Sequence, residues 1–509
     1  MTSPGAYSRL SRPFRGAVVT LAAVALVSGC AVGPNFQRPT PPAVSGYTRQ
    51  PFVAKTVSAD VAAGEEQRFV QNQAITQQWW TLFQSPQLDA LIDKALAANP
   101  TLVVAQTALR QAWELVYAQQ GFFYPTVQGN FSASRQQVSG TFTAPTVLNS
   151  MTLNFFTLQG TASWTLDVFG GNRRQVESLR AQAESQRFLL AAAYVVLTSN
   201  VVAAAVQEAS LRAQIAATED IIAISTQSLA LLRRQLDLGY VARLDVAAQE
   251  AALAQVRATL PPLRKQLELT RNLLTVLAGR FPSDQPTETF ELAALRLPQD
   301  LPVSLPSQVV DQRPDVRAAE EALHAAGAQV GVAIANMLPQ FTLTGAAGGT
   351  STAGISSMFK TGNPYWIGTS TLMQTLFDGG TLLHRKRAAE VAFEQAAAQY
   401  RSTVLTAFQN VADALYTLQS DAESLREAVA AEQAAQLTLD ITVKQQQLGY
   451  VNYLSLLSAQ QAYQQTRITR VQAQANRFAD TAALFQALGG GWWNRPDARA
   501  TQLTDQPSE

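Results

Sequence analysis

The sequence predicts a mixed α and β protein in which one structural unit occurs twice. Three observations predict this class: a motif order that repeats, two nearly uncharged segments of alternating polarity, and two very long stretches of helix-forming residues. Leu238-Gly239-Tyr240-Val241 recurs as Leu448-Gly449-Tyr450-Val451, and Asn99-Pro100 has its counterpart in Arg313-Pro314. A repeat period of about 210 residues indicates a duplicated domain, because solenoid repeats are far shorter.

The first thirty residues have the pattern of an export signal. Three arginines precede an apolar run at 17–27, and Ser28-Gly29-Cys30 follows it. A basic region, an apolar region and small residues before a cleavage site are typical of a secretory signal. The residues before Cys30 resemble a bacterial lipobox, so we expect a signal peptide over 1–29 and an acylated Cys30. An ordinary signal peptide that contains a cysteine is the alternative.

The composition excludes several classes of function. The 38 basic and 37 acidic side chains nearly cancel, which gives no electrostatic reason to expect nucleic acid as a partner. Cys30 is the only cysteine, and the two histidines, His324 and His384, have no cluster of metal ligands around them in the sequence. Phosphate-binding loops and nucleophile elbows are absent. We therefore expect no enzyme activity, no cofactor and no metal.

Two segments, at about 122–168 and 339–378, have the pattern of β-hairpins. Between Gly121 and Leu166 the only charged side chain is Arg135, and between Met337 and Phe377 it is Lys360. Apolar residues alternate with small polar ones, which is typical of a strand with two different faces; one face of the best example comprises Phe156, Leu158, Gly160, Ala162, Trp164 and Leu166. The edge of a soluble β-sandwich is the alternative, because barrel strands give weak signals individually.

A long helical hairpin is predicted after each β-hairpin. Residues 173–238 and 382–448 contain no proline and no internal glycine, and good helix formers dominate both stretches. About 65 helical residues would extend close to 100 Å, a length that suits coiled-coil packing. Gly239 and Gly449 then mark sharp turns into return helices. Outside the signal segment we expect no apolar run long enough for a membrane-spanning helix.

The predicted organisation has six parts. They are the signal peptide (1–29), an extended equatorial N-terminal segment (30–84), the first repeat (85–280), a linker with five prolines (281–306), the second repeat (307–490) and a C-terminal tail (491–509). Each repeat contains a helix, a β-hairpin and a long helical hairpin, in this order.

The number of strands predicts an oligomer, provided that the strands cross a membrane. Four strands per chain would leave two unpaired edges, and unpaired edges are not tolerated in lipid. Three chains would supply twelve strands, an even number within the range of outer-membrane barrels. We therefore expect a homotrimer.

The sequence resembles the TolC-like family of outer-membrane factors, and most closely its lipoprotein branch, which serves RND-type multidrug efflux systems. The residues that carry the resemblance are Cys30-Ala31-Val32-Gly33-Pro34-Asn35, Trp79-Trp80 with Phe83, Asp167-Val168-Phe169-Gly170-Gly171, the paired Leu-Gly-Tyr-Val turns and Leu454-Ser455-Leu456-Leu457-Ser458-Ala459-Gln460. The resemblance implies a trimeric 12-strand outer-membrane β-barrel, a long periplasmic α-helical barrel and an equatorial belt.

The resemblance also implies a function and partners. The chain would be a passive exit duct for drugs or other small toxic compounds, anchored in the outer membrane of a Gram-negative bacterium through Cys30. Its partners would be a periplasmic adaptor and an inner-membrane RND-type pump. An outer-membrane factor for type I protein secretion is one alternative, and a lipid-anchored periplasmic coiled-coil scaffold without a pore is another.

The resemblance assigns roles to two groups of residues near the glycine turns. The periplasmic gate would lie at Leu454, Ser455 and Ser458, where the family usually has an acidic ring, and Asp245 occupies the equivalent place in the first copy. The serines put cation selectivity in doubt, because acidic rings favour cations; packing against a neighbouring helix is their alternative role. The tips that dock the adaptor would comprise Gly239, Tyr240, Val241, Arg243, Gly449, Tyr450, Val451 and Asn452.

Overall fold

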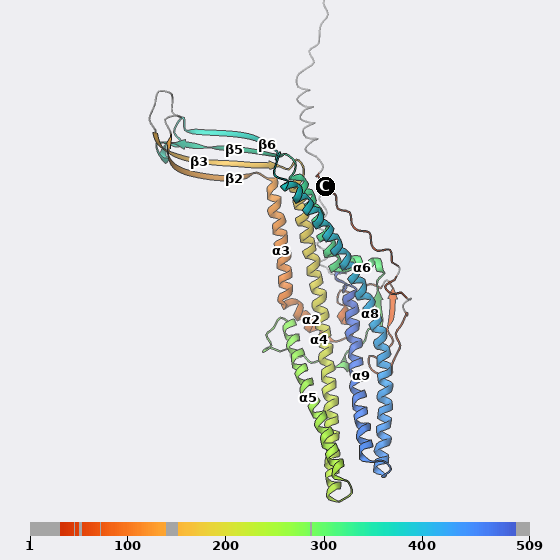
Figure 1. Cartoon of the computed structure of the whole chain (residues 1–509). Coiled ribbons are helices and arrows are strands. Elements are labelled where there is room, and N and C mark those ends of the chain that lie inside the picture. Colours follow the sequence, from red (N-terminus) through yellow and green to blue (C-terminus); the bar gives the residue numbers. More distant parts are fainter. Residues whose placement is uncertain are drawn as a thin grey trace, which may run out of the picture. The chain divides into compact units, whose positions relative to one another are not determined.

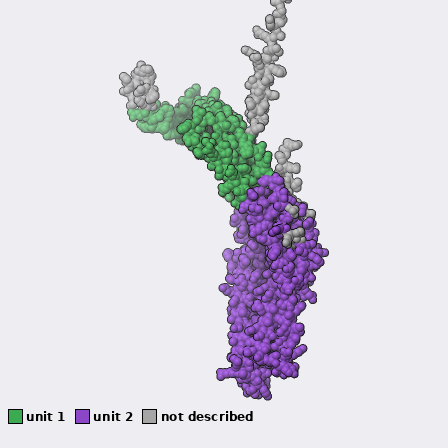
Figure 2. All heavy atoms as spheres, turned by 45° about the vertical axis from the view of Figure 1, so that its right-hand side comes forward, with its two compact units in different colours: residues 1–38, 109–185, 320–399 green, residues 39–108, 186–319, 400–509 purple. Residues whose placement is uncertain are grey.

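The computed structural model describes residues 31–44, 46–49, 53–71, 73–138, 151–285 and 288–494. The predicted signal peptide, Cys30 and the tail beyond Asn494 lie outside the described residues. The chain divides into two compact units, which Figure 2 colours separately. The first unit comprises Met1–Arg38, Leu109–Ser185 and Glu320–Gln399, and the second comprises Pro39–Ala108, Gln186–Ala319 and Tyr400–Glu509.

The helices repeat in order, and the long helices also repeat in length. The first copy contains α2 (Pro86–Ala98), α3 (Pro100–Gln120), α4 (Gly171–Asp237) and α5 (Arg243–Leu277); the second contains α6 (Pro306–Gln312), α7 (Pro314–Ala335), α8 (Thr381–Gln447) and α9 (Tyr453–Ala487). Helices α4 and α8 each have 67 residues, and α5 and α9 each have 35. The α4–α5 and α8–α9 pairs form two long hairpins (Figure 1). The internal duplication is therefore confirmed.

The first unit contains one antiparallel sheet. Its strands are β2 (Thr126–Val138), β3 (Met151–Leu166), β5 (Gln340–Ser351) and β6 (Pro364–Met373), hydrogen-bonded in the order β2-β3-β5-β6. All three pairs are antiparallel. The four strands predicted for the two hairpins are thus confirmed, and they belong to one sheet in which the hairpin of each copy contributes two neighbouring strands.

The strand register sorts the side chains by polarity. Because residues that face each other across a ladder share one face of the sheet, the pairing places most apolar side chains on one face: Val127, Phe131, Phe156, Leu158, Trp164, Phe341, Leu343, Trp366 and Leu372. The other face carries Gln128, Asn130, Ser132, Thr157, Gln159, Thr161, Thr344, Thr369 and Thr371. The sheet therefore has one apolar and one polar face.

The second unit contains a small parallel sheet that the sequence did not predict. Strand β1 (Arg68–Gln71) pairs with β4 (Asp300–Val303). β4 lies within the segment interpreted as a proline-rich linker, so this part of the chain is structured. Five short 3-10 helices complete the described elements: Trp79–Phe83, Gly121–Phe123, Leu292–Ala294, Ile355–Ser357 and Trp492–Asn494.

Aromatic residues form part of the core of the second unit. The indole of Trp79 is fully buried and stacks on Phe485, with the ring centroids 5.1 Å apart. Phe83 is also fully buried and packs beside Phe478. The Trp79-Trp80 motif thus joins the N-terminal segment to the return helix α9. Its role in this structure is packing.

One expectation about membrane helices was wrong. Outside the signal segment we expected no apolar run long enough to cross a membrane, but α4 contains an 18-residue window that is long and apolar enough. However, 56% of that window is buried inside the protein. Burial of this extent is typical of the core helix of a globular unit, in which an apolar stripe faces other protein elements.

Candidate functional site at the hairpin tips

Each long hairpin turns at a glycine in the left-handed region. Gly239 has φ 75° and Gly449 has φ 79°. The following N–H groups bond back into the helices: Tyr240 N–H donates to Gln235 O at 2.8 Å, and Tyr450 N–H donates to Gln445 O at 2.9 Å. This six-to-one bond is characteristic of the Schellman motif, which satisfies the last helix carbonyls and favours glycine at the left-handed position.

The two tips expose the same kinds of side chain. Tyr240 is 79% exposed and Tyr450 is 78% exposed. The leucines on either side of each turn are exposed as well: Leu238, Leu244, Leu448 and Leu454. Exposed apolar side chains that gather in this way are typical of a surface that binds a partner.

The other predicted docking residues differ in their surroundings. Arg243 is exposed, whereas Val241 and Val451 are half-buried, and Val241 packs against apolar residues of the hairpin core. The Asn452 side chain is used internally, because its Oδ1 accepts hydrogen bonds from the Ser455 backbone N–H at 3.0 Å and from the Ser455 hydroxyl at 2.9 Å. Asn452 therefore caps the N-terminus of α9.

Asp245 has the equivalent capping role in the first copy. Its Oδ2 accepts a hydrogen bond from the Ala242 backbone N–H at 3.1 Å, at the start of α5. An acidic side chain in the first turn of a helix is also favoured by the helix dipole. The side chain that caps the return helix thus lies in α5 itself in the first copy and immediately before α9 in the second.

The predicted gate residues of α9 share one side of the helix. Leu454, Ser455 and Ser458 are exposed, whereas Tyr453 and Leu456 are buried on the opposite side. The spacing explains this division, because residues four apart lie on the same face of a helix. The structure therefore brings the three gate residues of α9 together on one exposed side, whereas Asp245 belongs to α5.

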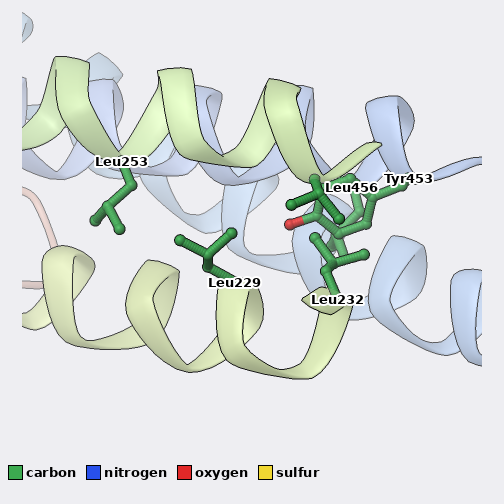
Figure 3. Packing of buried hydrophobic residues seen from close by; sticks show 6 residues of the cluster. Leu229, Leu232, Leu253, Tyr453 and Leu456 are labelled. Atoms are coloured by element: carbon green, nitrogen blue, oxygen red, sulfur yellow. The ribbon is translucent and has the colours of Figure 1, made fainter. Parts of the chain in front are cut away.

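A buried apolar cluster joins the two hairpins just above their turns. It comprises Leu229 and Leu232 of α4, Val246 and Leu253 of α5, and Tyr453 and Leu456 of α9. Figure 3 shows the labelled side chains converging from the three helices. The burial of these residues was not predicted from the sequence, although the three-residue spacing of Tyr453 and Leu456 is compatible with a buried helix face.

The hydroxyl of Tyr453 lies in an unfavourable place within this cluster. The pKa of Tyr453 is raised to about 12, mainly by burial and in addition by the nearby carboxylate of Asp245. Among the residues that the structure describes, none makes a hydrogen bond with the Tyr453 hydroxyl. The phenol therefore stays neutral at physiological pH. Burial of its hydroxyl without a hydrogen bond costs free energy.

We expect Tyr453→Phe to stabilise the protein by about 1 kcal/mol or to leave its stability unchanged, because it removes a buried hydroxyl without a partner. Leu456→Ala, in the same cluster, should instead destabilise it by about 2–4 kcal/mol through a cavity. Urea unfolding of both variants, followed by circular dichroism, measures the difference. A loss of stability in Tyr453→Phe comparable to that in Leu456→Ala would show that the hydroxyl has a stabilising partner.

Titratable side chains offer no metal site in the described part of the chain. No group of three or more His, Asp or Glu side chains there has an arrangement that could hold a metal ion. His324 lies between Glu177 and Glu321 in the first unit, with its Nε2 at 3.1 Å from Glu177 Oε1. Hydrogen bonding to Glu321 is the largest cause of the raised pKa of His324.

Known proteins match the chain over most of its length. The family described as outer membrane efflux protein matches residues 91–280 and 305–490. The probable efflux pump outer membrane protein TtgC of Pseudomonas putida is 28% identical over 481 residues, covering 94% of this chain and 96% of TtgC. The cation efflux system protein CusC of Escherichia coli K12 is 28% identical over 477 residues, covering 91% of this chain and 97% of CusC.

The fold matches solved outer-membrane channels. The channel OprN superimposes with a TM-score of 0.81 at 26% identity, covering 91% of this chain and all of OprN. CusC superimposes with a TM-score of 0.77, also at 26% identity, covering 90% of this chain and 99% of CusC. The two segments matched by the family cover nearly all of the two structural copies, including both hairpin tips. The chain therefore belongs to the outer membrane efflux protein family.

Proposed function

We propose that this chain is the outer-membrane exit duct of a tripartite efflux pump and passively conducts small toxic compounds out of the periplasm. The observation that carries the proposal is a sheet with one apolar and one polar face, in the same chain as two very long helical hairpins. In a barrel the apolar face would meet lipid and the polar face would line a water-filled passage. The named relatives are efflux components, which favours efflux over protein secretion.

We propose a homotrimer as the conducting form. In the four-stranded sheet that the structure describes, β2 and β6 are the edge strands. Lipid cannot satisfy the free N–H and C=O groups of an edge, so the edges must pair with other copies. Pairing β6 of one copy with β2 of the next would close twelve strands around three copies.

The N-terminal segment supports a lipid anchor at the junction of strands and helices. In the first unit, Arg174 of α4 donates hydrogen bonds to Val32 O at 3.0 Å and to Asn35 Oδ1 at 2.7 Å. Ala31 lies so close to Gly170 that a Cβ on Gly170 would be 2.6 Å from the Ala31 Cα. The residue after Cys30 is thus fixed beside the turn between β3 and α4, where acyl chains on Cys30 would reach the membrane boundary.

The hairpin tips would dock a periplasmic adaptor, and an inner-membrane pump of the RND type would supply the energy. Tyr240 and Tyr450 supply exposed aromatic rings, which are enriched at protein interfaces. Leu454, Ser455 and Ser458 would form the gate on the free side of α9. A gate of this composition would close by packing and hydrogen bonding, without an acidic ring.

Accumulation of dyes and antibiotics tests the proposal. Cells without this chain should accumulate several apolar or amphipathic compounds, and restoration of the chain should reverse this. If none accumulates although expression is verified, the drug efflux duct is wrong. The native mass after detergent extraction tests the assembly separately, because a stable monomer or dimer would contradict the shared barrel and favour a scaffold without a pore.

A further inference from the structure

The strands carry charges of one sign only. Between Gly121 and Leu166 the only charged side chain is Arg135, and between Met337 and Phe377 it is Lys360. Both side chains are exposed, and neither has a hydrogen-bond or ion-pair partner among the residues that the structure describes. Three copies would therefore gather six positive charges on the strands and their connections without any compensating acid.

Arg135 lies on the apolar face of the sheet. It pairs across the ladder with Asn154, two residues before Phe156, and it shares its side of β2 with Val127 and Phe131. In a membrane barrel this face points toward lipid. A charge on the lipid-facing side is costly at the centre of the bilayer and is tolerated near its boundary, where it can meet polar groups.

The position of Arg135 along β2 fits the outer boundary. Arg135 follows Thr126, the first residue of β2, by nine positions. At about 3.4 Å per residue this is roughly 30 Å along the strand. With a strand tilt of about 40°, it corresponds to roughly 23 Å across the membrane, close to the apolar band of about 25 Å in such barrels.

Lys360 lies at the same end of the sheet. It belongs to the connection between β5 and β6, four residues before Pro364, where β6 begins. Two exposed apolar side chains accompany it: Ile355 is 58% exposed and Phe359 is 62% exposed. Long basic side chains with apolar neighbours are typical of the interface, where the apolar parts enter lipid and the charge reaches the head groups.

We propose that Arg135 and Lys360 bind the phosphate groups of the anionic glycolipid of the outer leaflet. The inference rests on the proposed closure of the strands into a membrane-spanning barrel. The lipid's phosphates are opposite in sign to both side chains, and Arg binds phosphate through its planar guanidinium whereas Lys binds it as a point charge. The trimer would hold this lipid at three equivalent positions.

Binding of lipid A to the full-length trimer in detergent tests the inference. The probes are lipid A with both phosphates and the same lipid after enzymatic removal of the phosphates. The wild-type trimer should prefer the phosphorylated form by about thirtyfold, since each of the two basic side chains near an anionic surface contributes about 1 kcal/mol. The variant Arg135→Gln/Lys360→Gln should lose this preference. Arg135→Lys/Lys360→Arg and Lys265→Gln, an exposed lysine of α5, should keep it.

The outcomes separate this inference from the proposed function. An equal affinity of the wild-type trimer for both lipids, or an unchanged preference in the double glutamine variant, would overturn the lipid site. Conductance of the same preparation in planar bilayers reports on the barrel itself. Pores without a phosphate preference would contradict the lipid site alone, whereas the absence of both pores and trimers would contradict the barrel and the site together.

Discussion

Replacement of Arg477 by alanine is expected to destabilise the second unit by about 3–5 kcal/mol, because it breaks a buried polar network by removing its cation. The side chain of Arg477 is fully buried in α9. Its Nη1 donates a hydrogen bond to Ala63 O at 2.8 Å, and its Nη2 donates one to Gln67 Oε1 at 3.0 Å. The variant would leave both acceptors buried without this donor.

The network joins distant parts of the chain. Gln67 in turn donates hydrogen bonds to Pro298 O and to Thr481 Oγ1, both at 3.0 Å. Burial lowers the pKa of Arg477 to about 10, while the charges of Glu65 and Asp421 oppose this shift. Arg477 therefore remains charged at neutral pH, and it holds the N-terminal segment, the segment before β4 and α9 together.

A second arginine of α9 provides the control. Arg467 forms an ion pair with Asp220 at 2.9 Å, but both side chains are partly exposed, and such pairs contribute about 1 kcal/mol or less. Urea unfolding followed by circular dichroism should therefore rank Arg477→Ala well below Arg467→Ala in stability. Arg477→Lys should fall between them, because lysine keeps the charge but loses the planar fork of donors. Equal losses in the two alanine variants would contradict the structural role of Arg477.

The sequence predicted the local elements well because their signals are local. The Leu-Gly-Tyr-Val turns predicted the hairpin tips, since only glycine adopts the left-handed conformation at Gly239 and Gly449 without strain. Alternation predicted the faces of β3 for the same reason: successive side chains of a strand point to opposite sides. Because the unit is duplicated, each of these patterns occurs twice in the sequence.

Features that depend on distant contacts could not be predicted. Arg467, Arg470 and Arg477 all have the spacing of a solvated helix face, and only the approach of Gln67 makes Arg477 a core residue. Strand β4 was missed because it has four residues, one of them Pro302, and its partner β1 is more than 200 residues earlier. At the tip, the burial of Tyr453 could not be predicted, since it requires contacts with the neighbouring hairpin.

Stability is expected to fall as the pH rises from about 4 to about 8, and the cause is a pair of carboxyl groups between α8 and α9. The pKa of Asp480 is raised to about 8, mainly by burial and in addition by a hydrogen bond with Asp421 and by the charge of Asp421. The folded protein therefore holds a proton that the unfolded chain releases near the ordinary pKa of 3.8. When the native state binds more protons than the unfolded state, raising the pH favours unfolding.

The protonated carboxyl of Asp480 can donate the hydrogen bond that joins it to Asp421. Asp480→Asn preserves this donor without a titrating group. Between pH 5 and pH 8.5 its melting temperature should therefore change less than that of the wild type. The difference between the two changes should be about 3 °C or more for a protein of this size. Identical pH profiles of the two proteins would show that Asp480 is already ionised in the folded state, and the contact between α8 and α9 would then require another source of stability.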